Sequence, residues 1–165
     1  MNIVAATLAL FGKGSSAKSK GNGKHGADEE SALKSTILVI DDDPKFLETM
    51  RILLRGAGYT VLTSSTGPKG LDMIRYAPRG VRTVLLDFNM PGFNGAETLE
   101  YMRKLNPNVK VIAVSGFKVN ELPPSFQKGV NRFVAKPFSN GELLETIEEV
   151  LGGDLAAEMS ASASA

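Results

Sequence analysis

Short runs of apolar residues alternate with longer amphipathic segments through the middle of the chain. The runs lie at 36–40, 60–63, 83–86, 109–114 and 132–135. They are rich in β-branched and aliphatic residues, which is typical of strands buried on both faces of a parallel sheet. The pattern therefore predicts strands that are each followed by a helix.

The segments after the strands carry helix-start signals. Asp43 and Pro44 supply a capping side chain and a first-turn proline ahead of the first helix. Two later segments have the spacing of a capping box, in which a polar cap and a glutamate three residues on bond each other's backbone. The pairs are Asn94 with Glu97 and Ser139 with Glu142.

The last two predicted helices have distinctive lengths. Pro123 and Pro124 cannot lie inside a helix, so the fourth helix should begin near Pro124, last barely two turns and follow an extended segment. The last helix carries an apolar stripe and should stop at Gly152–Gly153, where the glycines suit a helix end. The stripe consists of Leu143, Leu144, Ile147, Val150 and Leu151.

Alternating strands and helices predict an α/β fold with a doubly wound five-stranded parallel sheet, formed by residues 35–151. Residues 1–34 are rich in Gly, Ser and Lys, and this composition predicts a flexible extension. Residues 2–11 have one apolar side, so this stretch is either a short helix or a frayed terminus. Residues 152–165 are rich in Ala and Ser and predict a disordered tail. We expect no separate output domain.

Composition removes several classes of function. The 165 residues contain 19 Lys and Arg against 18 Asp and Glu, a balance that argues against a broad nucleic-acid-binding surface. Without cysteine there is no disulfide, thiolate metal site or cysteine nucleophile. A serine–histidine triad would have to use His25, the single histidine, which lies in the expected flexible extension. The apolar stretch near the start is too short to span a membrane, so we expect a cytoplasmic protein.

Polar residues follow the predicted strands at their carboxyl ends, where doubly wound folds place their sites. A cluster of carboxylates either has raised pKa values or holds a divalent cation, and oxygen ligands with several waters suit Mg²⁺. An aspartate there could attack phosphorus, with a lysine and a hydroxyl group stabilising the phosphoryl oxygens. These residues are Asp41, Asp42 and Asp43 after the first run, Asp87 after the third, Ser115 in the fourth loop and Lys136 after the fifth run.

Together these motifs resemble the receiver domain of two-component response regulators, in a stand-alone form like the chemotaxis regulators. The motifs are ILVIDDDP at 37–44, LLDFNMPG at 85–92, VSG at 114–116 and FVAKPF at 133–138. The resemblance implies a flavodoxin-like sheet with strand order 2-1-3-4-5. It also implies that Asp87 is the phosphoacceptor and that Lys136 precedes a cis peptide bond to Pro137.

The same resemblance implies a metal site and a switch. Asp42 and Asp87 would bind Mg²⁺ directly, Asp41 would act largely through bound water, and Asn89 would contribute its backbone carbonyl. Ser115 and Phe133 match the switch hydroxyl and the switch aromatic residue. Phe117 lies two residues after Ser115, at a position where family members adjust the lifetime of the phosphate.

The function implied is a phosphoacceptor rather than an enzyme that turns over substrates. Its donor would be a sensor histidine kinase or a histidine phosphotransfer protein, and its response would be a changed protein-binding surface. The protein would be a monomer or a phosphorylation-dependent dimer. One alternative is a non-phosphorylated receiver-like scaffold. Another is a Mg²⁺-dependent aspartyl phosphatase, which usually needs an acid–base aspartate at the position of Asn89.

Overall fold

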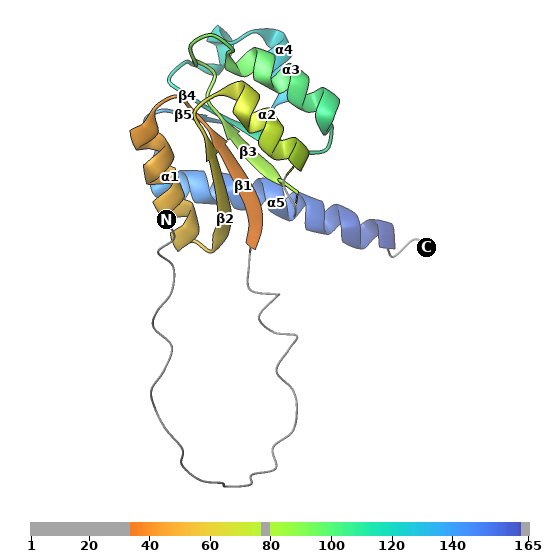
Figure 1. Ribbon diagram of the computed structural model, residues 1–165. Coiled ribbons are helices and arrows are strands. Elements are labelled where there is room, and N and C mark those ends of the chain that lie inside the picture. Colours follow the sequence, from red (N-terminus) through yellow and green to blue (C-terminus); the bar gives the residue numbers. More distant parts are fainter. Residues whose placement is uncertain (1–33, 77–79, 163–165) are drawn as a thin grey trace, which may run out of the picture.

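A parallel five-stranded sheet forms the centre of the molecule (Figure 1). The computed structural model describes residues 34–76 and 80–162. The strand order is β2-β1-β3-β4-β5 and every neighbouring pair is parallel, which confirms the predicted fold. The predicted flexible extension lies, except for Lys34, outside the described residues. The strands are β1 (Lys34–Ile40), β2 (Tyr59–Ser64), β3 (Thr83–Leu86), β4 (Lys110–Ser115) and β5 (Arg132–Ala135).

Alternation along each strand produces two separate cores, one on each face of the sheet. In β1, Ile37 and Val39 belong to one core, whereas Leu38 and Ile40 belong to the other. This is the period of two expected for a strand, and all four side chains are fully buried. Continuous apolar runs are therefore explained by burial on both faces rather than by an exposed apolar surface.

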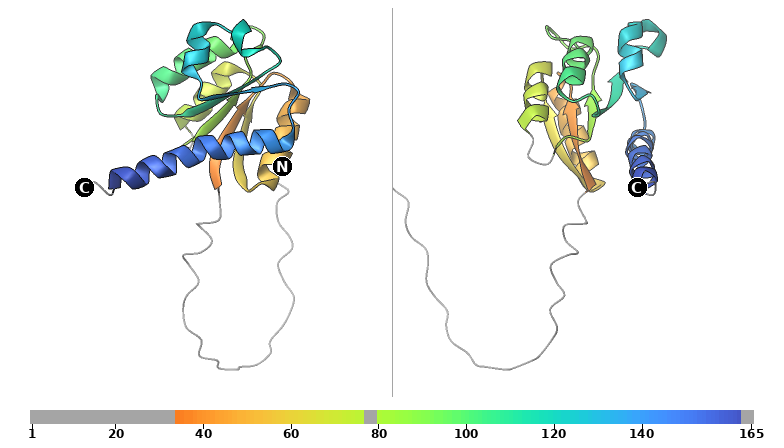
Figure 2. Two further views of the ribbon diagram at one scale, coloured as in Figure 1. Left: turned by 180° about the vertical axis from the view of Figure 1, so that it is seen from behind. Right: turned by 90° about the vertical axis from the view of Figure 1, so that its right-hand side faces the viewer.

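Helices cover both faces of the sheet, with α1 and α5 on one side and α2 and α3 on the other (Figure 2). Phe126 of the short helix α4 is buried in the core that α2 and α3 cover. Within the described ranges, no helix is both long enough and apolar enough to cross a bilayer. The helices are α1 (Pro44–Gly56), α2 (Gly67–Tyr76), α3 (Gly95–Leu105), α4 (Pro124–Gly129) and α5 (Asn140–Ser162).

The predicted caps at Asp43 and Asn94 are present, and one of the two bonds predicted between Ser139 and Glu142 forms. The Asp43 carboxylate accepts a hydrogen bond from the Lys45 amide at 2.9 Å, and Pro44 occupies the first turn of α1. Ahead of α3 both bonds of the capping box form at 3.0 Å, from the Glu97 amide to Asn94 and from the Asn94 amide to Glu97. At the start of α5, the Glu142 amide donates to Ser139 Oγ at 3.2 Å.

Two predictions about the last third of the chain were wrong. The segment before α4 is not fully extended, because a 3₁₀ turn, η1 (Val119–Glu121), forms where the Glu121 carboxylate accepts the Lys118 amide at 2.8 Å. Helix α5 does not stop at Gly152–Gly153 but continues to Ser162. Glycine costs only about 1 kcal/mol in a helix relative to alanine, and extending an existing helix is far easier than nucleating one. Two glycines therefore permit a helix end without imposing one.

A close backbone contact fixes the start of α3 beneath the loop that follows β3. The Gly95 amide donates to the Phe88 carbonyl at 3.0 Å. A Cβ atom on Gly95 would lie 2.4 Å from the Asp87 carbonyl oxygen and 2.7 Å from Phe88 Cα. Only glycine allows this approach, so α3 supports the backbone of Asp87 directly.

We expect Gly95→Ala to lower the free energy of unfolding by about 1–3 kcal/mol, because backbone atoms must move to accept the added methyl group. Gly56→Ala is the matched control, since a Cβ at Gly56 meets no atom within 4 Å and the residue lies in α1. This control should leave stability unchanged or raise it by up to about 1 kcal/mol. Urea denaturation of both variants measures the difference, and equal stabilities would contradict the close contact.

Candidate functional site

The carboxyl edge of the sheet brings together residues that lie far apart in the sequence. Asp41 directly follows β1 and Asp87 directly follows β3, the neighbouring strand. The Asp87 amide donates to the Ile40 carbonyl at 2.9 Å, which continues the pairing of the two strands past their ends. On the other side of the edge, the Lys136 amide donates to the Ser115 carbonyl at 2.8 Å.

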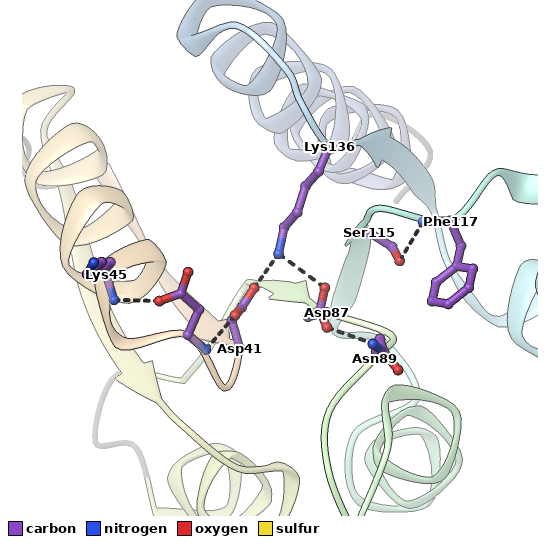
Figure 3. A network of polar contacts seen from close by, with 8 residues as sticks. Asp41, Lys45, Asp87, Asn89, Ser115, Phe117 and Lys136 are labelled. Atoms are coloured by element: carbon purple, nitrogen blue, oxygen red, sulfur yellow. Dashed lines mark hydrogen bonds and ion pairs between the residues drawn. The ribbon is translucent and has the colours of Figure 1, made fainter.

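The Lys136 ammonium group lies between the two carboxylates (Figure 3). Its Nζ atom is 2.6 Å from Asp41 Oδ2 and 3.2 Å from Asp87 Oδ1. Both aspartates are buried, whereas 28% of the Lys136 side chain is exposed. The solvent-exposed part of this cluster therefore belongs mainly to the Lys136 side chain.

Backbone amides hold the remaining carboxylate oxygens. Asp41 Oδ1 accepts the Asp43 amide at 2.9 Å, and Asp87 Oδ2 accepts the Asn89 amide at 2.8 Å. Each buried carboxylate therefore has one oxygen on an amide and the other on Lys136. Charge-assisted bonds of this kind fix the orientation of both groups.

Two buried carboxylates share a single ammonium group, and this shapes the electrostatics of the site. Burial raises the pKa of Asp87, and the negative charge of Asp41 adds to the rise, although Lys136 and the Asn89 amide oppose it. Burial alone would lower the pKa of Lys136, but its hydrogen bond to Asp41 and the charges of Asp87 and Asp41 outweigh this and raise it. The cluster thus carries an excess of negative charge and a firmly protonated lysine.

The donor set fits a hard divalent cation, because it consists of carboxylate oxygens that are only partly neutralised. Asp42 is exposed and forms no hydrogen bond or ion pair with the described part of the chain. In residues 34–76 and 80–162, no three Asp, Glu, His or Cys side chains are grouped as a metal site. The predicted ligands therefore remain a prediction.

The predicted switch residues share one face of the sheet. Ser115 pairs with Ala135 and Phe133 pairs with Ala113, so alternation places Ser115 and Phe133 on the same side. Ser115 is fully buried, and its Oγ accepts the Phe117 amide at 3.3 Å. Phe133 is half-buried and lines a pocket of about 160 Å³ beside η1 and α4.

Three aromatic contacts at the site were not predicted. The Phe46 ring lies beneath the ammonium group of Lys136, with Nζ 4.1 Å from the ring centroid. Phe88 contacts the rings of Phe117 and Phe126 at centroid distances of 5.9 and 5.1 Å. No role at the site was predicted for Phe46, which lies on α1. Its position five residues after Asp41, in the first turn of that helix, was the signal that it lies at the carboxyl edge.

The chain is similar to known proteins in family, in sequence and in structure. Residues 37–148 match the response regulator receiver domain family. The chain is 33% identical over 119 residues to the uncharacterized transcriptional regulatory protein YkoG of Bacillus subtilis, covering 72% of this chain but 51% of YkoG. The chain therefore spans about half the length of this curated relative.

Solved structures of response regulators have a similar fold. A receiver domain protein from Clostridium thermocellum is 26% identical with a TM-score of 0.69, over 75% of this chain and 99% of that one. The response regulator TrrA from Thermotoga maritima, in complex with Mg²⁺-BeF, is 27% identical with a TM-score of 0.63, over 71% of this chain and 99% of that one. The cis bond expected between Lys136 and Pro137 is present.

We expect Asp87→Asn to raise the free energy of unfolding at pH 7 by about 1–3 kcal/mol in Mg²⁺-free buffer. The substitution removes a buried charge and leaves the ion pair between Lys136 and Asp41 in place. The raised pKa means that the native protein binds this proton more tightly than the unfolded chain does. Ionising Asp87 therefore costs stability as the pH rises above the ordinary value of 3.8. The stability that Asp87→Asn gains over the wild type should consequently shrink as the pH falls towards that value.

Urea denaturation from about pH 3.5, below the ordinary carboxyl pKa of 3.8, to about pH 8 measures this difference. Asp42→Asn is the control, since it removes the same charge from an exposed residue and should change stability by less than about 0.5 kcal/mol. A destabilised Asp87→Asn variant at pH 7 would show that the Lys136 pairing outweighs burial.

Proposed function

The chain belongs to the response regulator receiver domain family, and on that basis we propose that Asp87 accepts a phosphoryl group and that the resulting acyl phosphate alters a protein-binding surface. The observation that carries the proposal is the bridge from Lys136 to the buried Asp41 and Asp87. The bridge keeps the Asp87 carboxylate beside a cation at the carboxyl edge, and Ser115 lies at the end of the intervening strand.

In the proposed transfer, a carboxylate oxygen of Asp87 donates its electron pair to phosphorus and forms the new O–P bond. The P–N bond of a donor phosphohistidine breaks, and its electron pair stays on the imidazole nitrogen. A donor protonated on its other ring nitrogen leaves as neutral imidazole. Asp87 needs no general base, because its ionised form is already deprotonated. A small donor such as acetyl phosphate would release acetate instead.

The residues around Asp87 would have different roles in this transfer. Asp87, Asp42 and the backbone carbonyl of Asn89 would hold Mg²⁺, and Asp41 would act through bound water. The ion, when bound, would neutralise the charge of the phosphoryl oxygens. Lys136 is the cation already present, and it would exchange its bond to Asp87 for a phosphoryl oxygen. Ser115 would donate its hydroxyl proton to another phosphoryl oxygen.

Phosphorylation would release the connection between β4 and α4. Ser115 Oγ holds the Phe117 amide at 3.3 Å, and this bond would be lost when the hydroxyl group turns towards the phosphate. Space would open on the face that Ser115 shares with Phe133, into which the Phe133 ring could rotate. Phosphorylation would thus shift a balance between two arrangements of the α4–β5 surface.

The phosphodonor would be another chain, a sensor histidine kinase or a histidine phosphotransfer protein. His25, the single histidine of this chain, lies outside the described residues. We propose that the response passes through a protein partner, and that the chain is a phosphoacceptor rather than an enzyme acting on small phosphomonoesters.

We expect the full chain to gain a single phosphoryl group from acetyl phosphate in Mg²⁺ buffer. Intact-protein mass spectrometry and Phos-tag electrophoresis measure this gain, and a chelator should prevent it. Asp87→Asn should abolish it, whereas Asp72→Asn, which neutralises an aspartate of α2, should leave it intact.

An unmodified wild-type chain that also fails to respond to beryllofluoride would support the receiver-like scaffold instead. Sustained turnover of a small phosphomonoester would support the aspartyl phosphatase. Modification that persists in Asp87→Asn would place the phosphoacceptor elsewhere.

Phe117 should determine how long the phosphate survives. Its side chain is 40% exposed beside the site, and its ring packs edge-on against Phe88. We expect Phe117→Glu to hydrolyse the acyl phosphate about ten times faster, equivalent to about 1.4 kcal/mol, because a polar side chain admits and orients water. Phe117→Leu keeps an apolar side chain and should stay within about two-fold of the wild type. Decay of the phosphorylated chain after removal of the donor measures both rates, and slower hydrolysis in Phe117→Glu would contradict this role.

A further inference from the structure

We propose that Phe46 is a positioning residue for Lys136, and that its ring face holds the ammonium group where it can pass from Asp87 to an incoming phosphoryl group. This inference rests on the proposed function. The contact joins an uncharged ring to the charged group at the centre of the site. Phe46 lies in the first turns of α1, and Lys136 follows β5, so distant parts of the chain meet at this contact.

The geometry is that of a cation–π interaction. Lys136 Nζ lies 4.1 Å from the centroid of the Phe46 ring, well inside the distance of about 6 Å over which a ring face attracts a cation. The same nitrogen bonds Asp41 at 2.6 Å and Asp87 at 3.2 Å. An ammonium group has three N–H donors. Lys136 Nζ has three neighbours at these distances, the two carboxylates and the face of the Phe46 ring.

A second aromatic residue, Phe138, packs against the Phe46 ring. Phe138 contacts Phe46 edge-to-face, with centroids 6.2 Å apart and ring planes at 89°. Both rings pack against the core cluster beneath α1 and α5. Phe138 lies two residues after Lys136, so the segment that carries the lysine also braces the ring on which the lysine rests.

An aromatic face suits this position because it attracts the cation without carrying a charge. A third carboxylate would bind Lys136 more tightly, but it would also repel a phosphoryl group and add to the negative charge near Asp87. A flexible lysine held by carboxylates alone could turn away into solvent when Asp87 becomes an acyl phosphate and loses its charged oxygen. The Phe46 ring keeps the ammonium group at the site during that exchange.

The test compares phosphorylation of full-length variants by acetyl phosphate and Mg²⁺. Phe46→Leu keeps an apolar side chain but removes the ring, and should lower the rate by about 3- to 30-fold, the range that cation–π energies give. Phe46→Tyr restores the ring and should restore the rate. Leu53→Ala is the control, because Leu53 also lies on α1 and packs against the same core cluster. It should lower stability without changing the rate.

A second measurement detects the contact without any phosphorylation. In wild-type protein labelled with ¹³C-lysine, the ε-methylene protons of Lys136 should show an upfield ring-current shift. This shift should be lost in Phe46→Leu and kept in Phe46→Tyr and Leu53→Ala. An unshifted wild-type signal would overturn the contact.

The outcomes separate the two proposals. A wild-type chain that takes no phosphoryl group overturns the proposed function, whatever the nuclear magnetic resonance signal shows. A wild-type chain that is phosphorylated while Phe46→Leu matches its rate overturns the positioning role and leaves the proposed function standing. Equal losses in Phe46→Leu and Leu53→Ala would also overturn it, because the effect would then follow from stability.

Discussion

The interaction on which the carboxyl edge depends is the sharing of one ammonium group by two buried carboxylates. Strands β1 and β3 are neighbours, so Asp41 and Asp87 are forced together and would repel each other. Lys136 reaches them from β5, two strands beyond β3, and its long side chain crosses the end of β4 to do so. Because a buried ion pair rarely adds much net stability, this arrangement is better explained by function than by folding.

A second constraint fixes the short helix α4 on the far side of the site. Phe126 is buried against Phe88, the residue after the proposed phosphoacceptor. At the other end of the helix, Arg103 of α3 donates to the carbonyls of Gly129 and Val109. Burial lowers the pKa of Arg103, yet its hydrogen bonds to carbonyls compensate the lost solvent. The short helix α4 is therefore held at both ends, and a shift of it would break its contact with Phe88 or with Arg103.

Local rules predicted most of the fold, but they supplied neither the strand order nor the end of α5. The caps at Asp43 and Asn94 follow from residues two or three positions apart, so the sequence contains the whole interaction. Strand order could not come from such rules and rested on resemblance to a family. The end of α5 was wrong because glycine permits several conformations and the neighbouring helix decides among them.

The site shows the same division. Spacing placed Asp41, Asp87 and Lys136 at one edge, because the carboxyl ends of parallel strands must meet there. Spacing could not show that Asp42 faces solvent while Asp41 is buried, since adjacent residues in a loop have no fixed period. Nor could it pair Phe46 with Lys136, because helix periodicity reports only that a residue is apolar and not which cation lies above it.

The hydrogen bonds of Ser115 and of Lys136 near Asp87 differ in strength. A neutral hydrogen bond such as that from the Phe117 amide to Ser115 contributes about 0.5–1.5 kcal/mol, whereas bonds to charged groups contribute about twice as much. A phosphoryl group at Asp87 would therefore draw Ser115 away at little cost, while Lys136 would remain at the site, and the loop between β4 and α4 is the part of the molecule that would move first.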